Sequence, residues 1–413
     1  MLCRSIALFL FASLIVVRGA GSANRTNERG RAANTPSSGT VPIDLRDNRV
    51  FVNLTVARAD GSLRKARFWV DSGGGAVILS ESLSHDLGLK ATGPVSKREG
   101  QTFQPVTAPA IRVSEMPLDL AGVPVIVAVG LKDEAFVGMG AEGFLPARVL
   151  RKYEVVFDYP GRKFTMAQPG VLKPQGTPVP SPIGEHSGFP RIEMTIAGEK
   201  YGFLLDTGAA YTMISDALLT KWRAAHPQWP TCTGAAGAAN MIGGSFDAKA
   251  EMLRIPEMQW GTFRLHGVGV VSRPGGTFEK YMSQMMPAPI VGSIAGNVLC
   301  AFRVQIDYAH GVTYLEKRGS INAHDLDTVG IVVGSRPGGS YVIGGVVKRD
   351  GKEAVEGVNA GDKLLRIGDW EVQGQTLADV LRALRGKPGE ARTLLLERDG
   401  KQITVTATVA SLL

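Results

Sequence analysis

Two short segments of this 413-residue chain place an aspartate directly after an apolar run and before a hydroxyl residue and a glycine. They are Asp71-Ser72-Gly73 and Asp206-Thr207-Gly208. Two carboxylates held about 3 Å apart cannot both ionise, so they share one proton. The ionised carboxylate can then deprotonate a water molecule while the protonated one polarises a carbonyl group. Such a pair can hydrolyse a peptide bond without a metal or a covalent intermediate.

One copy of this segment would be typical of an ordinary turn in which the aspartate side chain accepts a backbone N–H. Two copies, each behind three apolar residues, favour a catalytic pair formed by Asp71 and Asp206. In this interpretation Gly73 and Gly208 allow the tight backbone turn. The hydroxyl groups of Ser72 and Thr207 fix the two loops.

The two segments belong to an internal repeat, which determines the expected architecture. Residues 68–74 correspond to residues 203–209, with an offset of 135 that also matches Ser80 with Ser215. Farther along, residues 153–159 correspond to residues 302–308 with an offset of 149. The second copy is therefore longer, and we expect its insertions within 222–229 and 282–289.

The repeat predicts two similar lobes, residues 42–170 and 180–318, joined by the proline-rich stretch 174–182. A pseudo-two-fold axis between them would bring Asp71 and Asp206 together. From Val41 onward, short β-branched runs alternate with glycine and proline turns, so the expected fold class is mostly β.

Residues 321–413 have a different pattern and are expected to form a small separate α+β domain. Strand-like runs occur at 330–333, 341–347, 363–367 and 393–398. A helix over 376–384, capped by Thr376, places its leucines and Val380 on one face.

With these segments, the chain resembles retropepsin-like aspartic proteases of bacteria, in which two lobes share one chain and a PDZ domain follows. The resemblance covers most of residues 42–410. It implies a bilobal acid-protease fold, with Asp71 and Asp206 as the catalytic pair and Ser72 and Thr207 bracing their loops. In that family an apolar-apolar-glycine element runs beside each catalytic loop. Here Pro146 and Ala295 stand where that glycine is usual.

Similar proteases close a mobile hairpin over the substrate. The segments 100–102 and 234–244 occupy corresponding places after the two aspartates, and each is equally consistent with an ordinary loop.

The C-terminal segment resembles a PDZ domain, because 361–367 has its Gly-Asp turn and apolar strand. The resemblance implies a site for protein C-termini at a loop and strand that comprise Gly339, Ser340, Tyr341, Val342 and Ile343. The alternative is a packing domain without a ligand.

The N-terminus predicts export. Arg4, the apolar stretch 6–17 and the small residues after it have the order of a signal peptide, expected to span residues 1–23. A flexible leader, 24–41, would follow. We therefore expect a periplasmic or extracellular protein with no membrane span after cleavage. Cys232 and Cys300 would form either a disulfide or two free thiols.

Other functions lack support in the sequence. The net charge of +8 is not gathered into basic runs with interleaved aromatics, so no nucleic-acid partner is expected. The six histidines form no metal-binding pattern, and we expect neither a metal nor another cofactor. The leading hypothesis is an exported aspartic endopeptidase acting on peptide or protein substrates. Its rival is a non-catalytic peptide-binding adaptor with degenerate lobes.

Overall fold

The computed structural model describes residues 35–413 apart from 99–100, 130–138, 237–247 and 337. The predicted signal peptide, residues 24–34 of the predicted leader and residues 237–244 of the second candidate flap lie outside the described residues. Of the first candidate flap, Gly100 lies outside them, whereas Gln101 and Thr102 belong to β6. The predicted leader is too long at its C-terminal end. Ser38–Val41 already belong to β1 because they pair with β12.

The first lobe consists of twelve strands and two short helices in the described residues. Its strands are β1 Ser38–Arg46, β2 Arg49–Ala57, β3 Leu63–Asp71, β4 Val77–Leu79, β5 Ser96–Arg98, β6 Gln101–Pro105, β7 Ile111–Val113, β8 Met116–Pro117, β9 Val125–Val129, β10 Gly143–Pro146, β11 Glu154–Asp158 and β12 Lys163–Ala167. Its helices are α1 Glu81–Asp86 and α3 Ala147–Leu150.

The second lobe repeats this order with longer connections. Its strands are β13 Thr177–Pro180, β14 Arg191–Ile196, β15 Glu199–Leu205, β16 Thr212–Ser215, β17 Thr231–Thr233, β18 Glu251–Trp260, β19 Phe263–Arg273, β20 Gly292–Ile294, β21 Phe302–Asp307 and β22 Val312–Lys317. Its helices are α4 Asp216–Ala225 and α5 Gly296–Leu299, with helical turns at Thr277–Met282 and Ser283–Met285. The mostly β fold is confirmed.

The two copies start their first helices in the same way. Ser80 caps α1 by accepting the backbone N–H of Leu83, and Ser215 caps α4 by accepting that of Leu218. A hydroxyl at this position satisfies an N–H group that the helix itself leaves unpaired. The serine match found in the repeat therefore has a structural cause.

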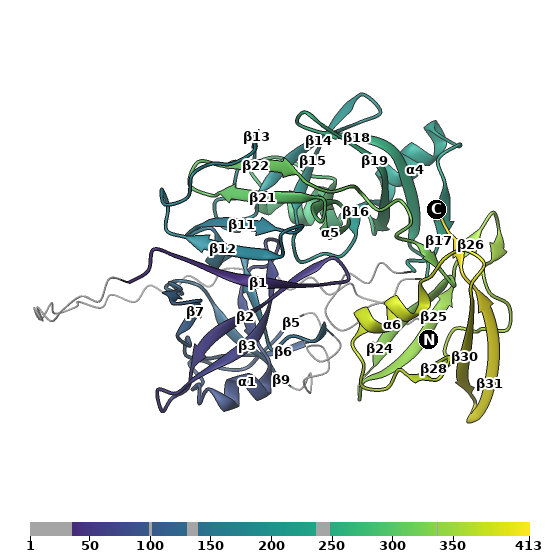
Figure 1. Ribbon diagram of the computed structural model, residues 1–413, viewed down its shortest axis with the longest axis horizontal. Coiled ribbons are helices and arrows are strands. Elements are labelled where there is room, and N and C mark those ends of the chain that lie inside the picture. The colour runs from purple at the N-terminus through teal and green to yellow at the C-terminus, as the bar shows by residue number, and fades with distance from the viewer. Residues whose placement is uncertain (1–34, 99–100, 130–138, 237–247, 337) are drawn as a thin grey trace, which may run out of the picture.

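The lobes meet in one antiparallel strand pair, β11 with β21 (Figure 1). Within that pair Val156 lies opposite Gln305, its own equivalent at the offset of 149. A residue can face its own repeat equivalent only on a two-fold axis, so the pseudo-symmetry predicted by the repeat is present in the backbone. The pair makes β11 and β21 part of a single 15-stranded sheet that joins both lobes.

The C-terminal segment has a sheet of its own and one helix. Its elements are β23 Asp327–Thr328, β24 Ile331–Arg336, β25 Ser340–Val346, β26 Lys348–Arg349, β27 Lys352–Glu353, β28 Lys363–Ile367, β29 Trp370–Glu371, α6 Leu377–Leu384, β30 Ala391–Arg398, β31 Lys401–Thr408 and β32 Ala410–Ser411. Thr376 caps α6, and the four apolar residues predicted for its buried face are buried.

This C-terminal domain is not packed independently of the lobes. The hairpin β26–β27 extends the nine-stranded sheet of the second lobe through a pair between Thr233 and Lys348. Leu326, Val332, Val347 and Leu412 share an apolar cluster with residues of that lobe, including Tyr211. The expectation of a fully separate domain is therefore corrected, because part of its apolar surface completes the core of the second lobe.

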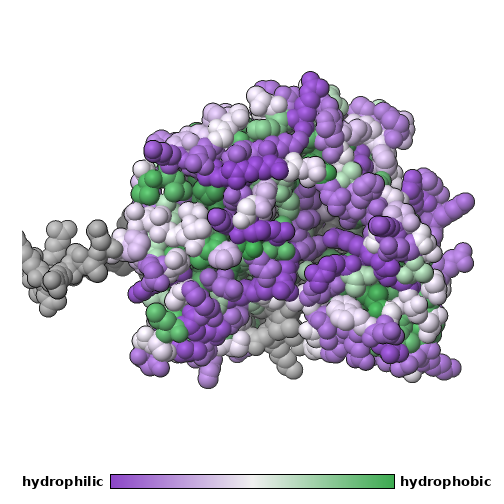
Figure 2. All heavy atoms as spheres, viewed as in Figure 1, coloured by the Kyte–Doolittle hydropathy of each residue, from purple (hydrophilic) through white to green (hydrophobic). Residues whose placement is uncertain are grey.

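The surface is mostly hydrophilic on the face shown in Figure 2. Large apolar side chains that are exposed in the described residues lie far apart in the sequence: Leu63, Val95, Val171 and Tyr281. None of the helices in the described part of the chain combines the length and apolar character needed to cross a bilayer.

Candidate active site

Each aspartate leaves the end of a buried strand that has a parallel neighbour. In the first lobe β10 runs parallel to β3, with Pro146 opposite Asp71. In the second lobe β20 runs parallel to β15, and the N–H of Asp206 donates to the carbonyl of Ile294 at 2.9 Å. The last three residues before each aspartate are apolar and buried, so they fix the backbone position from which each carboxylate extends.

Pro146 and Ala295 occupy positions where glycine is usual in the similar proteases, but the backbone beside them still contacts the two aspartate loops. The N–H of Ala147 donates to Gly74 O, and the N–H of Gly296 donates to Ala209 O, both at 3.0 Å. These bonds are equivalent in the repeat. The two positions differ in one hydrogen bond. The N–H of Ala295 donates to the Thr212 hydroxyl at 3.2 Å, whereas Pro146 has no N–H to donate. Val77 occupies the place of Thr212 in the first lobe and has no such acceptor.

The two loops brace each other through their hydroxyl groups. The backbone N–H of Ser72 donates to Thr207 Oγ1 at 3.1 Å, and that of Thr207 donates to Ser72 Oγ at 3.0 Å. The hydroxyl of Ser72 donates to Leu205 O, and that of Thr207 donates to Val70 O. All four bonds are buried and cross between lobes, and each contributes about 1 kcal/mol net.

The bracing sets the two carboxylates side by side. Asp71 Oδ1 accepts the N–H of Gly73 at 2.7 Å, and Asp206 Oδ1 accepts those of Gly208 and Ala209 at 3.1 and 3.0 Å. A Cβ atom added to Gly73 would lie 3.2 Å from Asp71 Oδ1 and 3.4 Å from Asp206 Oδ1. The two oxygens therefore flank one atom-sized position.

Burial raises the pKa of both carboxyl groups. Burial raises the pKa of Asp71 to about 7, with a further contribution from the negative charge of Asp206. Burial also raises the pKa of Asp206, to about 6. Hydrogen bonds from the N–H groups of Ala209 and Gly208 oppose this rise, because they stabilise the charged form. The nearby Ser293 hydroxyl acts in the same direction, whereas the equivalent residue of the first lobe is Phe144. Asp206 accepts two backbone N–H groups where Asp71 accepts one, so Asp206 is the favoured site of the negative charge when the pair holds one proton.

The space between the loops excludes a side chain at Gly208. A Cβ atom there would overlap Cγ and Oδ1 of Asp71. We expect Gly208→Ala to reduce kcat/KM at least about a hundredfold, because displaced catalytic groups lose the geometry on which the rate depends. Gly275→Ala is the matched control, since a Cβ atom at Gly275 meets nothing within 4 Å. Equal peptide hydrolysis by both variants would contradict this steric constraint.

Sequence reasoning missed three residues at the turn between β1 and β2. Asp47 and Asn48 both have positive φ, 44° and 62°, and Arg46 pairs with Arg49 across the turn. A two-residue turn with Asp or Asn at its centre, between alternating apolar residues, is a hairpin signal that the sequence does contain. The turn reaches the loop that contains Asp206, where Arg49 Nε donates to Gly208 O at 3.2 Å.

The predicted site for protein C-termini is corrected by the structure. Gly339 lies in the hairpin turn between β24 and β25, and its N–H already donates to Arg336 O. Tyr341 and Val342 lie in β25, which pairs with β24 on one side and β28 on the other. No free edge is left there for an added peptide strand. The strand order of this sheet begins at β24 and ends at β31, so both are edge strands, and the short β29 pairs with β28 alone.

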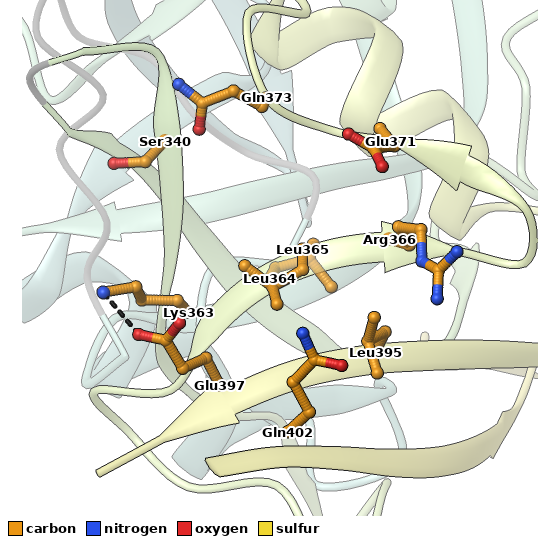
Figure 3. Close-up of a pocket in the computed structure, with 10 residues that line it drawn as sticks. All are labelled: Ser340, Lys363, Leu364, Leu365, Arg366, Glu371, Gln373, Leu395, Glu397 and Gln402. Carbon is orange, nitrogen blue, oxygen red and sulfur yellow. Dashed lines mark hydrogen bonds and ion pairs between the residues drawn. The ribbon is translucent and has the colours of Figure 1, made fainter. Parts of the chain in front are cut away.

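A hollow of about 420 Å³ lies on the C-terminal domain over β28, β30 and β31 (Figure 3). An ion pair between Lys363 and Glu397 closes one end of it. Of the five residues predicted to bind peptides, Ser340 is the one that lines this hollow. Its lining residues are Ser340, Lys363, Leu364, Leu365, Arg366, Glu371, Gln373, Leu395, Glu397 and Gln402.

The cysteines and metal-binding side chains add no second centre in the described part of the chain. Cys232 and Cys300 are free thiols, and burial raises the pKa of each to about 12, so both stay protonated at neutral pH. Across those same residues, no group of three or more His, Cys, Asp or Glu side chains is arranged to hold a metal ion.

Comparison with known proteins gives one family match. Residues 192–292 match the family model described as aspartyl protease, a segment that includes Asp206 and ends at Gly292 of β20. None of the curated proteins compared matches the chain. Among solved structures, the chain is similar to an aspartic proteinase from Irpex lacteus, with a TM-score of 0.43 and 14% sequence identity. That similarity covers 69% of this chain and 99% of the other.

Proposed function

We propose that this protein is an aspartic endopeptidase that uses Asp71 and Asp206 to activate one water molecule. The observation that carries the proposal is the pair itself. Two carboxylates from repeat-equivalent loops, Asp206 buried and Asp71 partly buried, flank one position, and the reciprocal Ser72–Thr207 hydrogen bonds hold the loops in place. The aspartyl protease match over residues 192–292 supports the same activity.

The asymmetry of the pair assigns a role to each carboxylate. Asp206 accepts two backbone N–H groups where Asp71 accepts one, so Asp206 is the better-stabilised carboxylate. It is the base that takes a proton from water as the water oxygen attacks the scissile carbonyl carbon. Asp71 holds the shared proton and passes it to the carbonyl oxygen. When the resulting diol collapses, the proton on Asp206 moves to the departing amine and Asp71 recovers its own. No covalent bond forms to the protein.

The raised pKa values predict activity at mildly acidic to neutral pH. The pair holds one proton between the pKa of about 6 for Asp206 and that of about 7 for Asp71, so turnover should peak in this range. Above it the pair loses its last proton and activity falls. Hydrolysis of denatured casein from pH 3 to 8, with and without pepstatin, measures this profile. No pepstatin-sensitive hydrolysis at any pH would contradict the proposal and favour the non-catalytic adaptor.

A control separates loss of the proton from loss of the fold. Because folding raises these pKa values, the pair favours the folded state below the unfolded pKa of about 4, and this contribution disappears as pH rises through the folded values. Thermal unfolding over the same pH range should therefore show a modest decline. Activity must fall while the protein is still folded for the pair to be the cause.

We further propose that the protein is exported and that its C-terminal domain contributes to substrate binding. The order of charged, apolar and small residues before position 24 supports export. Recruitment of extended peptides would use β24, an edge strand of the domain that lies beside α6. A strand at the edge of a sheet can pair with an added peptide through its free backbone groups.

A further inference from the structure

The turn Asp47–Asn48 of the first lobe is hydrogen-bonded to the loop that contains Asp206. Arg49 Nε donates to Gly208 O at 3.2 Å, and Asn48 Nδ2 donates to Ala210 O at 3.3 Å. The fit extends to α5, where a Cβ atom at Gly296 would overlap the carbonyl oxygen of Asn48. The loop that contains Asp206 is thus held from outside its own lobe.

These contacts depend on the buried guanidinium group of Arg49. The Arg49 side chain is 3% exposed, lies over the ring of Trp69 at 5.4 Å and pairs with Asp47 at 2.9 Å. The Asp47 carboxylate is itself only 2% exposed. A buried ion pair of this kind is stable only when its remaining hydrogen-bonding atoms also have partners.

The partner of the second Asp47 oxygen comes from the C-terminal domain. Arg385, the residue after α6, donates through Nη2 to Asp47 Oδ1 at 3.2 Å. The Arg385 backbone is fixed by a bridge to Thr328, and its carbonyl accepts a hydrogen bond from Arg392. The packing of the C-terminal domain therefore determines that the Arg385 side chain lies at Asp47.

We propose that Arg385 is a positioning residue for the active site, and that docking of the C-terminal domain completes a chain Arg385–Asp47–Arg49 that fixes the carbonyl of Gly208. This inference rests on the proposed peptidase function. Without Arg385, Asp47 Oδ1 loses its hydrogen-bond donor while it is buried. The side chains of Asp47 and Arg49 then rearrange so that this oxygen regains a partner. Gly208, the neighbour of the catalytic pair, then loses its external restraint.

The contacts Arg385–Asp47–Arg49 also affect the pKa values of Asp71 and Asp206. The Arg49 guanidinium lowers the pKa of both Asp71 and Asp206. In the described residues, the other ionisable groups that face the pair are Tyr308, near Asp71, and Tyr159, near Asp206; burial raises the pKa of both, so they stay neutral. A rearranged Arg49 therefore raises the pKa values of the pair, whereas a structural defect that lets water reach the pair lowers them, because burial is the main cause of their rise.

The test compares Arg385→Ala with Arg382→Ala in the full-length chain. Arg382 is the matched control, because it belongs to α6, is 74% exposed and pairs with Asp379 of the same helix. For Arg385→Ala we expect kcat/KM on a short peptide to fall about tenfold and the alkaline limb of its pH profile to move to higher pH. Arg385→Lys should restore part of both, since an ammonium group can still pair with one oxygen.

A readout without turnover separates this inference from the proposed function. Titration of ¹³C-labelled aspartate carboxyls by NMR reports the pKa values of Asp71 and Asp206 directly. A rise of these pKa values in Arg385→Ala but not in Arg382→Ala supports the inference, even if the wild-type protein hydrolyses nothing. Unchanged or lowered pKa values in Arg385→Ala overturn it, whether or not its activity or thermal stability falls.

Discussion

Replacing either aspartate of the pair with asparagine is expected to remove nearly all turnover, by at least about a thousandfold. Asp71→Asn removes the carboxyl that holds the shared proton, and Asp206→Asn removes the base. Because the two act as one unit, the double variant should be no slower than each single variant. Measurement of kcat on a peptide substrate at pH 6 to 7 checks this.

The fold of these variants should survive, and this can be checked separately. Burial and the facing charge raise the pKa of Asp71, so a neutral side chain there relieves an unfavourable charge above pH 7. Thermal unfolding of Asp71→Asn at pH 8 should therefore occur at or above the wild-type temperature. Asp60→Asn, in an exposed turn of the first lobe, is the control for loss of a carboxylate. Retention of more than a tenth of wild-type turnover by either single variant would contradict the mechanism.

Deleting residues 321–413 is expected to abolish cleavage of short peptides as well as of proteins. The deletion removes Leu326, Val332 and Leu412 from the cluster that covers Tyr211 behind the second catalytic loop. It also removes Asp325, the partner of the buried Arg254 at 2.8 Å. Loss of one partner of a buried ion pair costs about 3–5 kcal/mol, a large part of the total stability of a domain.

The measurement is kcat/KM for one short peptide and one protein substrate, together with thermal unfolding of both proteins. The Arg385→Ala variant is the control that keeps the shared core intact. Equal losses on both substrates support a domain that completes the second lobe. Unchanged cleavage of the short peptide with weaker cleavage of the protein would instead show a separable domain that only recruits substrate.

Parts of the fold that depend on local patterns follow from the sequence. The helix α6 has the predicted cap at Thr376 and the predicted buried face, because cap and periodicity are properties of neighbouring residues. The repeat predicts the two-fold axis, which appears as Val156 opposite Gln305. The predicted strand runs of the C-terminal domain correspond to β24, β25, β28 and β30.

The prediction of a peptide site at residues 339–343 was wrong because local sequence patterns do not determine whether a strand lies at the edge of a sheet. A glycine turn followed by an apolar strand looks the same whether the strand is at an edge or inside a sheet. The pairing of β25 on both sides is decided by strands distant in sequence. Edge position is therefore a property of the assembled sheet.

The sequence by itself determined the residues on which the proposed chemistry rests: two aspartates on equivalent turns, their hydroxyl and glycine neighbours, and the symmetry that pairs them. Only the tertiary structure decided what surrounds that pair. Gly208 O is held by Arg49, 159 residues away, and Arg49 is held through Asp47 by Arg385, 338 residues from Asp47. Contacts over such separations follow from how lobes and domain pack, and a buried charge acquires its partners and its pKa only once that packing excludes water.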